Sequence, residues 1–213
     1  MYTTPLSSVI DEFIPIQHCL YADDTQIYVN LTPETACSML QILKTCLDSI
    51  QKWMAENRLK LNPDKTEFIV FGSPSQKSLL SNFFPLELLG QQCIPAEKLN
   101  NLGVIWDSDF ILSNHISFLK ISCLYHIYDL SRIRRYLSKA MATTLANALV
   151  SSRLDYCNSL FQALKQQQCN KLQSIQNILC RIVARLPRRA HVSRTMKGLH
   201  WLPVRQRILF KIN

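Results

Sequence analysis

Apolar and polar positions alternate in two short runs near the start of the chain. These runs, residues 14–21 and 25–30, are typical of paired strands and predict a β-hairpin with Asp23 and Asp24 at or beside its tip. From Pro33 the apolar spacing changes to steps of three and four residues, which predicts a helix reaching about residue 57. Its buried stripe comprises Ala36, Met39, Leu40, Leu43, Leu47, Ile50 and Trp53.

The next part of the first half predicts short strands and turns. Asn62-Pro63-Asp64 is a turn signal, and residues 68–71 form an apolar run that predicts a buried strand ended by Gly72. The polar, serine-rich residues 73–82 predict a loop. Two further short strands are expected, near residues 84–89 and 99–106.

The second half has a helical pattern from about residue 113. Its apolar residues recur at three- and four-residue steps in successive stripes, and Pro203 is expected to open a last helix. Strands with one helix, followed by helices, predict the α+β class. The stripes comprise Ile116, Leu119, Cys123, Ile127 and Leu130; then Met141, Leu145, Ala148 and Leu149; then Leu172, Ile175, Ile178, Leu179 and Ile182.

Charge divides the chain more sharply than the hydrophobic pattern does. The 213 residues are 47% hydrophobic, enough for a core and one or two domains, and the net charge is +9. Residues 1–114 carry −6 and residues 115–213 carry +15. The basic half is expected to bind a polyanion such as nucleic acid. The alternative is a helical domain that is merely basic.

The positions of the cysteines and histidines predict neither a disulfide framework nor a zinc site. The eight cysteines form no CxxC pair and no Cys/His cluster with zinc spacing, so we expect a reducing, intracellular compartment and no structural zinc. No apolar run is long enough for a membrane span, and the start lacks a signal-peptide pattern. Trp53 and Trp201 are expected in the core. No chemistry is assigned to His115, His126, His191 and His200.

The adjacent Asp23 and Asp24 allow two interpretations. Aspartate is common in solvated turns, because it tolerates the left-handed conformation. Two carboxylates on one turn are also suitable ligands for a divalent cation, which would offset their mutual repulsion. The pair alone does not decide between them.

Five stretches in a fixed order, the last two in one region, resemble the reverse transcriptases of LINE-type, non-LTR retrotransposons. Tyr21-Ala22-Asp23-Asp24 looks like the family's Tyr-x-Asp-Asp box, and WMAENRLKLNPDKTEFIVFG (53–72) resembles the segment that follows it. Asn101-Leu102-Gly103-Val104 resembles the hairpin that grips the primer end. SRLDYCN (152–158) and LHWLPVRQRI (199–208) resemble the thumb region. The resemblance implies that residues 1–110 are the C-terminal part of the palm and residues 111–213 a helical thumb or connection region.

The resemblance also implies roles around the Asp-Asp box. Asp23 would be a Mg²⁺ ligand with Asp24 as a supporting acid, in a two-metal nucleotidyl transfer. Tyr21 and Ala22 would pack under the primer end. Lys65 would act as a general acid near the leaving pyrophosphate, or else be an ordinary surface lysine.

The partners implied are an RNA template and a DNA primer. Leu102 and Gly103 would contact the primer, although a glycine there also suits an ordinary bulge or turn. A set of basic side chains would follow the phosphates of the template–primer duplex. For any one of them a solvated helix face is the simpler interpretation, and only the cluster supports phosphate binding. The set comprises Arg132, Arg134, Arg135, Arg153, Arg181, Arg185, Arg188 and Arg189.

The sequence departs from the family pattern before the Asp-Asp box, and this changes the activity that we expect of the chain. A third metal-binding aspartate and the nucleotide-selecting segment would lie before the Asp-Asp box, where only 22 residues precede Asp23. The chain therefore reads as truncated at both ends, and we expect this fragment to be inactive as an RNA-directed DNA polymerase. The alternatives are a non-catalytic nucleic-acid-binding remnant that uses the basic half, and a decayed element without function.

Overall fold

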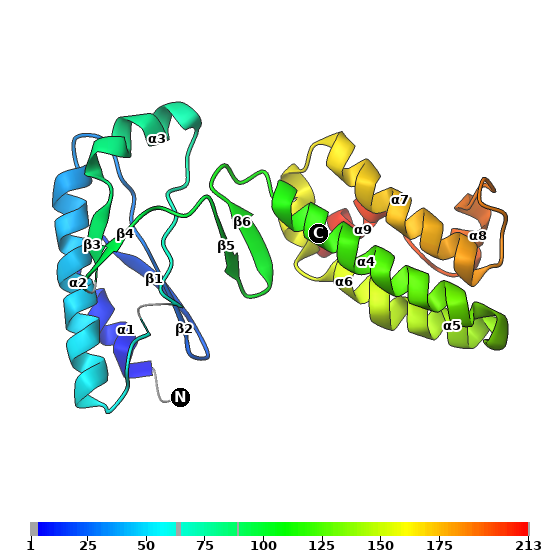
Figure 1. Cartoon of the computed structure of the whole chain (residues 1–213), viewed down its shortest axis with the longest axis horizontal. Coiled ribbons are helices and arrows are strands. Elements are labelled where there is room, and N and C mark those ends of the chain that lie inside the picture. Colours follow the sequence, from blue (N-terminus) through cyan, green and yellow to red (C-terminus); the bar gives the residue numbers. More distant parts are fainter. Residues whose placement is uncertain (1–3, 63–64, 89, 213) are drawn as a thin grey trace. The chain divides into compact units, whose positions relative to one another are not determined.

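The computed structural model describes residues 4–62, 65–88 and 90–212, which fold as two compact units (Figure 1). Unit 1 runs to Leu99 and includes Ser108–Phe110; unit 2 comprises Asn100–Asp107 and the residues from Ile111 onward. Helices combine with three two-stranded sheets, β1–β2, β3–β4 and β5–β6, in agreement with the predicted α+β class. Across the described residues, no helix is both long and apolar enough to cross a lipid bilayer.

The predicted hairpin is confirmed. Strand β1 (Gln17–Tyr21) pairs in antiparallel fashion with β2 (Asp24–Tyr28), and Tyr21 lies directly opposite Asp24. Leu20 and Ile27 pack inward, against the core of unit 1. Since side chains alternate across a strand, the residues next to them face outward.

Helix α2 (Ala36–Glu56) and helix α1 (Thr4–Asp11) supply most of the core of unit 1. The α2 helix begins three residues later than predicted, because Thr32–Thr35 form a hydrogen-bonded turn before it. Trp53 is half-buried against this core. The fully packed residues are Leu6, Ile10, Ile16, Cys46 and Ile50.

The segment after α2 differs from the prediction. Residues 66–71 form no strand: Phe68 O accepts one bond from Ala96 N, and Gly72 N donates one to Ser108 O, without a ladder. The predicted turn at Asn62-Pro63-Asp64 lies partly outside the described residues.

The predicted loop at residues 73–82 is wrong. Helix α3 (Pro74–Leu80) and the 3-10 turn η2 (Ser81–Phe83) occupy it. Ser73 and Gln76 form a capping box at the start of α3, with Pro74 in the first turn. This arrangement satisfies backbone donors that a short polar helix would otherwise leave exposed.

Two small hairpins replace the two remaining predicted strands. Strand β3 (Leu86–Leu88) pairs with β4 (Gln91–Cys93), which the apolar pattern did not predict. Strand β5 (Lys98–Asn101) pairs with β6 (Val104–Asp107), so the single strand expected at residues 99–106 is a hairpin.

Unit 2 is built mainly of helices around one core. Helix α4 (Ser113–Ile133) buries all five residues of its predicted stripe. Trp201 is buried as predicted, at 7% exposure. The other elements are η3 (Arg134–Tyr136), α5 (Lys139–Ala146), η4 (Asn147–Ser151), α6 (Ser152–Asp155), η5 (Asn158–Ala163), α7 (Gln166–Val183), α8 (Ser193–Gly198) and α9 (Val204–Ile212).

The stripe predicted on α5 is displaced by one residue. Met141 is 55% exposed, whereas Ala142, Ala146 and Val150 are fully buried. Small alanines let this helix approach its neighbours closely, so the buried face is set by packing and not by the largest side chains. On α7, the predicted stripe is buried or half-buried except at the exposed Ile178.

Candidate metal hairpin and nucleic-acid surfaces

The tip of the β1–β2 hairpin presents both aspartates to solvent. Ala22 and Asp23 form the two-residue connection, and Asp24 begins β2 opposite Tyr21. Ala22 has φ 56°, a left-handed conformation that costs a residue with a Cβ about 1 kcal/mol. Asp23, Asp24 and Tyr21 are all exposed. The hairpin therefore holds the two carboxylates outward.

The opposite face of the hairpin fixes this orientation. His18 Nε2 lies 2.7 Å from Ser7 Oγ on α1, and His18 Nδ1 lies 3.6 Å from Asp11 Oδ1. A shift of one residue in register would turn Leu20 outward and the acids inward. Packing against α1 therefore determines where Asp24 points.

The hairpin can supply part of a metal site. Carboxylate oxygens suit Mg²⁺, which takes six ligands in an octahedron and commonly keeps several waters. Within the described residues, no group of three or more His, Cys, Asp or Glu is placed to hold a metal ion. Asp23 and Asp24 thus have the right donor chemistry, but a two-metal centre needs further oxygen ligands.

Lys65 lies in unit 1 with its side chain exposed. Its backbone amide donates to Asn62 O at 3.2 Å. In the part of the chain that the structure describes, no hydrogen bond or ion pair joins Lys65 to either aspartate. The general-acid role proposed for Lys65 therefore stays a prediction.

The turn between β5 and β6 is held by a tyrosine from far along the chain. Leu102 and Gly103 have φ 49° and 77°, the pattern of a tight two-residue hairpin turn. Tyr156 Oη donates to Leu102 O at 2.6 Å, and a Cβ at Gly103 would lie 3.7 Å from the Tyr156 ring. The SRLDYCN motif thus meets the turn within unit 2. The sequence did not predict this contact between Tyr156 and the turn, although Tyr156 lies in the SRLDYCN motif.

Strand β6 is also anchored by two buried polar residues. His115 Nδ1 accepts from Ile105 N at 3.3 Å, and burial lowers the His115 pKa, which Asp107 partly offsets. Asp107 accepts from Ser113 Oγ, Asn114 N and Asn114 Nδ2. Burial opposes the charged form of Asp107, but these bonds bring its pKa below the ordinary value.

An ion pair joins the SRLDYCN and LHWLPVRQRI motifs. Arg207 Nη2 donates to Asp155 Oδ2 at 2.6 Å, with both side chains partly buried. Burial raises the pKa of Asp155, while Arg207 and Lys211 oppose that shift. The pair ties α9 to α6, so SRLDYCN and LHWLPVRQRI lie together in unit 2.

Arg134 differs from the other arginines of the predicted phosphate-binding set. It is only 8% exposed, and its guanidinium donates to three backbone carbonyls, those of Ile182, Val183 and Leu137. The Ile182 and Val183 carbonyls lie at the C-terminal end of α7, where backbone carbonyls lack the helical partners they have further inside the helix. Arg134 is therefore committed to the interior of unit 2, which the sequence pattern did not reveal.

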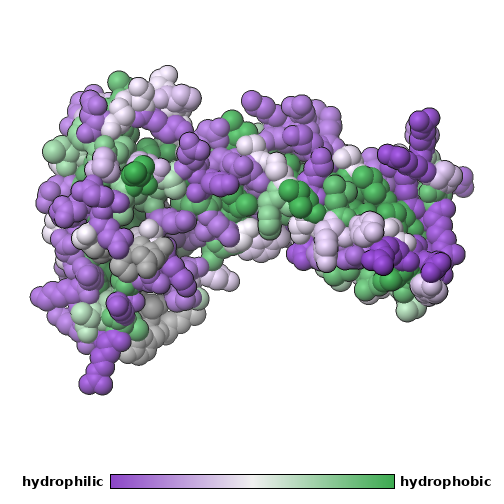
Figure 2. Space-filling model, viewed as in Figure 1, coloured by the Kyte–Doolittle hydropathy of each residue, from purple (hydrophilic) through white to green (hydrophobic). Residues whose placement is uncertain are grey.

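The other arginines of the set are exposed or half-buried. Arg185 donates to the carbonyls of Arg134 and Arg135, so the loop after α7 lies against the end of α4. Figure 2 shows hydrophilic residues gathered at this end of unit 2, beside α5 and α8. Arg188 and Arg189 are exposed in the same loop. Arg185, Arg188 and Arg189 therefore form an exposed basic group in the loop after α7.

The outer face of α4 carries exposed apolar and aromatic side chains. Phe118, Ile121, Tyr125 and Tyr128 are each more than half exposed, and the Arg132 guanidinium lies 5.9 Å from the Tyr128 ring. Their three- and four-residue spacing was visible in the sequence as a second stripe on the same helix. Aromatic and basic groups together are common on surfaces that bind nucleic acid.

Residues 1–106 match the family model described as reverse transcriptase (RNA-dependent DNA polymerase). The matched stretch contains the exposed Asp-Asp hairpin, Lys65 and the turn at Leu102 and Gly103. This part of the chain is therefore similar in sequence to reverse transcriptase domains. No curated protein and no solved structure matched the chain.

Proposed function

We propose that the chain is a fragment of the reverse transcriptase of a LINE-type, non-LTR retrotransposon. Residues 1–110 would be the C-terminal part of the palm and residues 111–213 the helical thumb. The family match over residues 1–106, with an Asp-Asp box at an exposed hairpin tip, carries the proposal. The order of the later motifs supports the extension to the basic half.

In this proposal Asp23 and Asp24 hold Mg²⁺ together with ligands beyond this hairpin. Asp23 and Asp24 would supply carboxylate oxygens to the ions, and the bound ions would contribute Lewis-acid activation of the primer 3′-hydroxyl and charge stabilisation at the transferred phosphate. Tyr21 and Ala22 lie beside the acids, where they would support the primer end. The strained turn at Leu102 and Gly103 would contact the primer backbone, because glycine permits close approach.

The basic surface would hold the template–primer duplex through its phosphates. Arg132, Arg135, Arg188 and Arg189 are exposed and suited to such contacts. Arg134 is left out, because its donors bind backbone carbonyls. Binding of this kind is independent of base sequence and falls steeply with salt.

A second candidate is a non-catalytic nucleic-acid-binding protein that uses the same surface. The observation in its favour is the acid count: the hairpin offers two adjacent carboxylates, fewer than a two-metal centre needs. Under this alternative Asp23 plays no part in binding. The two candidates agree on the basic surface and differ at the hairpin.

A combined binding and extension assay tests the proposal. The probe is an RNA template annealed to a DNA primer, with Mg²⁺ and deoxynucleotides, and the proteins are wild type, Asp23→Asn and the exposed control Asp48→Asn. We expect salt-sensitive duplex binding by all three and no primer extension by the chain alone.

The outcomes separate the candidates. Incorporation that Asp23→Asn abolishes and Asp48→Asn preserves would show that the chain itself polymerises. Binding without incorporation, unaffected by Asp23→Asn even when Mg²⁺ is present, favours the non-catalytic candidate. Weaker binding by Asp23→Asn only in the presence of Mg²⁺ supports the metal hairpin. Affinity no higher than that of an unrelated protein of equal charge overturns both.

A further inference from the structure

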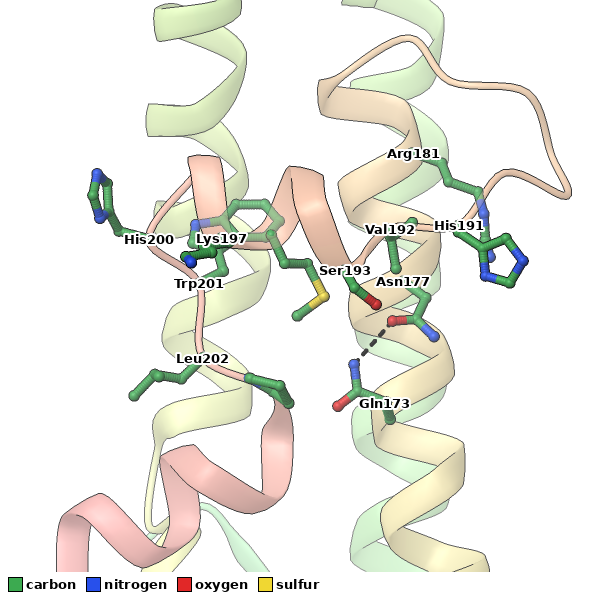
Figure 3. Close-up of a pocket in the computed structure, with 12 residues that line it drawn as sticks. Gln173, Asn177, Arg181, His191, Val192, Ser193, Lys197, His200, Trp201 and Leu202 are labelled. Atoms are coloured by element: carbon green, nitrogen blue, oxygen red, sulfur yellow. Dashed lines mark hydrogen bonds between the residues drawn. The ribbon is translucent and has the colours of Figure 1, made fainter.

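A pocket lies in unit 2, whereas the Asp-Asp hairpin belongs to unit 1, and Arg181 is the only lining residue that belongs to the predicted phosphate-binding set. The pocket has a volume of about 760 Å³ and is formed by α7, the loop after it, α8 and the segment that leads into α9 (Figure 3). The lining residues are Gln173, Asn177, Arg181, His191, Val192, Ser193, Met196, Lys197, His200, Trp201, Leu202 and Pro203. A space of this size is large enough for a nucleotide.

Arg181 and Lys197 give the pocket two basic, charged side chains, and His191 and His200 add two imidazole rings. Arg181 and His191 lie on one side, Lys197 and His200 on the other, and Ser193 between them (Figure 3). Among the described residues that line the pocket there is no Asp or Glu. A recessed site with basic groups on two sides and no acid attracts an anion, because the walls focus the field into the pocket.

The wall formed by α7 is held in a fixed arrangement. Gln173 Nε2 donates to Asn177 Oδ1 at 2.9 Å, and Gln173 Oε1 accepts from Val204 N at 2.9 Å. Arg181 Nε donates to Ala190 O at 3.0 Å, which anchors the guanidinium beside the loop. Groups held in this way lose little side-chain entropy when a ligand binds.

The rest of the lining is apolar. Met196 and Trp201 are buried at 5% and 7% exposure, and Leu202 and Pro203 complete this part of the wall. A phosphate by itself would leave these surfaces unfilled. A nucleotide combines an anionic phosphate for the basic groups with a flat base for the apolar wall.

We propose that this pocket binds an unpaired nucleotide of a single-stranded nucleic acid. Its phosphates would contact the basic groups on the two sides, and its base would enter between them. A duplex keeps its bases stacked and paired, so it cannot place one in a recess without extruding it. The inference rests on the proposed nucleic-acid function and adds to it a single-strand site separate from the exposed duplex-binding arginines.

Fluorescence anisotropy with labelled oligouridine, oligothymidine and a hairpin duplex tests the site. Lys197→Glu reverses one charge at the pocket, and Lys171→Glu makes the same change at an exposed site on α7 outside it. We expect Lys197→Glu to weaken single-strand binding about tenfold and the Lys171→Glu change to weaken it much less. Equal losses in the two variants would overturn the proposal.

A second variant separates pocket occupation from charge. Ser193→Phe places a large side chain at an exposed lining position without changing the net charge. It should weaken binding of both single strands and leave duplex binding unchanged, with an unaltered helical circular dichroism spectrum and melting temperature as the folding control. Unchanged single-strand binding by folded Ser193→Phe would contradict the proposal.

The choice of probes shows whether a negative result contradicts the pocket site alone or the proposed nucleic-acid function as well. Tighter binding of oligouridine than of oligothymidine would assign the site to RNA, and the reverse to DNA. If the wild type binds duplex but its single-strand affinity ignores both pocket variants, only the pocket inference fails. If it binds no probe more tightly than an unrelated protein of equal charge, the proposed function fails with it.

Discussion

Single side chains hold the β5–β6 hairpin against the helices of unit 2, and His115 is the most buried of them. Its ring is 1% exposed and accepts a hydrogen bond from the backbone of β6. A neutral ring is required for this bond, because a protonated imidazole has no acceptor nitrogen. The backbone contact therefore depends on the protonation state of one residue.

Because His115 is buried as a neutral ring, we expect the protein to lose stability in mild acid. Its folded pKa lies below 6.5, so its contribution is complete above pH 6.5 and is lost as the pH falls toward the lowered value. The free energy of unfolding should fall by up to about 1.4 kcal/mol per pH unit in that window. Urea unfolding at several pH values measures it. His115→Gln should flatten the dependence and the exposed control His191→Gln should not; identical slopes would contradict the assignment.

Replacing Leu102 with a residue suited to its left-handed backbone conformation should stabilise the protein. It sits at φ 49°, where asparagine is tolerated better than a leucine. Leu102→Asn should raise the free energy of unfolding by about 1 kcal/mol, and the branched Leu102→Val should lower it. Thermal and urea unfolding of the two variants would show this, and a lower stability for Leu102→Asn would mean that side-chain packing outweighs the backbone conformation.

At the scale of elements, some helices and strands are specified by nearby residues, whereas others depend on contacts with residues far along the chain. The β1–β2 hairpin and helix α4 follow directly from their apolar spacing. Helix α3 has no such spacing, yet Ser73, Pro74 and Gln76 carry a recognisable capping sequence that outweighs the polar composition. The turn of β5–β6 depends instead on Tyr156, which is 54 residues away from Leu102.

Removing the Tyr156 hydroxyl should destabilise the turn between β5 and β6. Tyr156→Phe keeps the ring beside Gly103 and removes only the hydroxyl that donates to Leu102 O. The stability of unit 2 should fall by about 1 kcal/mol. Hydrogen exchange of the amides at 101–104 should accelerate, because the turn loses its anchor. The exposed Tyr128→Phe is the control, and equal exchange in the two variants would show that the bond contributes nothing.

At the scale of the whole molecule, the two units have very different cores. Unit 1 has a core cluster of five buried residues around α1, β1 and α2, whereas the core of unit 2 continues from β6 through α9. Hydrophobic stabilisation grows with the apolar area buried, so unit 2 should be the more stable. Trp53 lies in the core region of unit 1, and both Trp201 and Trp106 lie in the core region of unit 2.

Two unfolding transitions are therefore expected. In urea, the fluorescence of Trp53 should change at a lower concentration than that of Trp201, since separate cores unfold separately. Variants that keep one tryptophan, with phenylalanine at the others, distinguish the signals. Coincident transitions for the two reporters would show that the units unfold as one.

The sequence by itself determined the local features of this protein. Spacing of apolar residues predicted the Asp23–Asp24 hairpin and the buried face of α4, because a period of two or of three to four residues is a property of neighbouring residues. The charge division and the Asp-Asp box were likewise visible without a structure. The family match over residues 1–106 agrees with the coarser resemblance of this stretch to reverse transcriptases.

Tertiary structure decided which residues meet. The carbonyls that engage Arg134 at the end of α7 lie up to 49 residues away, and Asp155 and Arg207, which form the ion pair, are 52 residues apart. The same holds for the basic pocket around Trp201. Such pairs depend on how helices pack and not on local spacing, so an arginine that resembles a phosphate ligand in the sequence can be an interior cap in the fold.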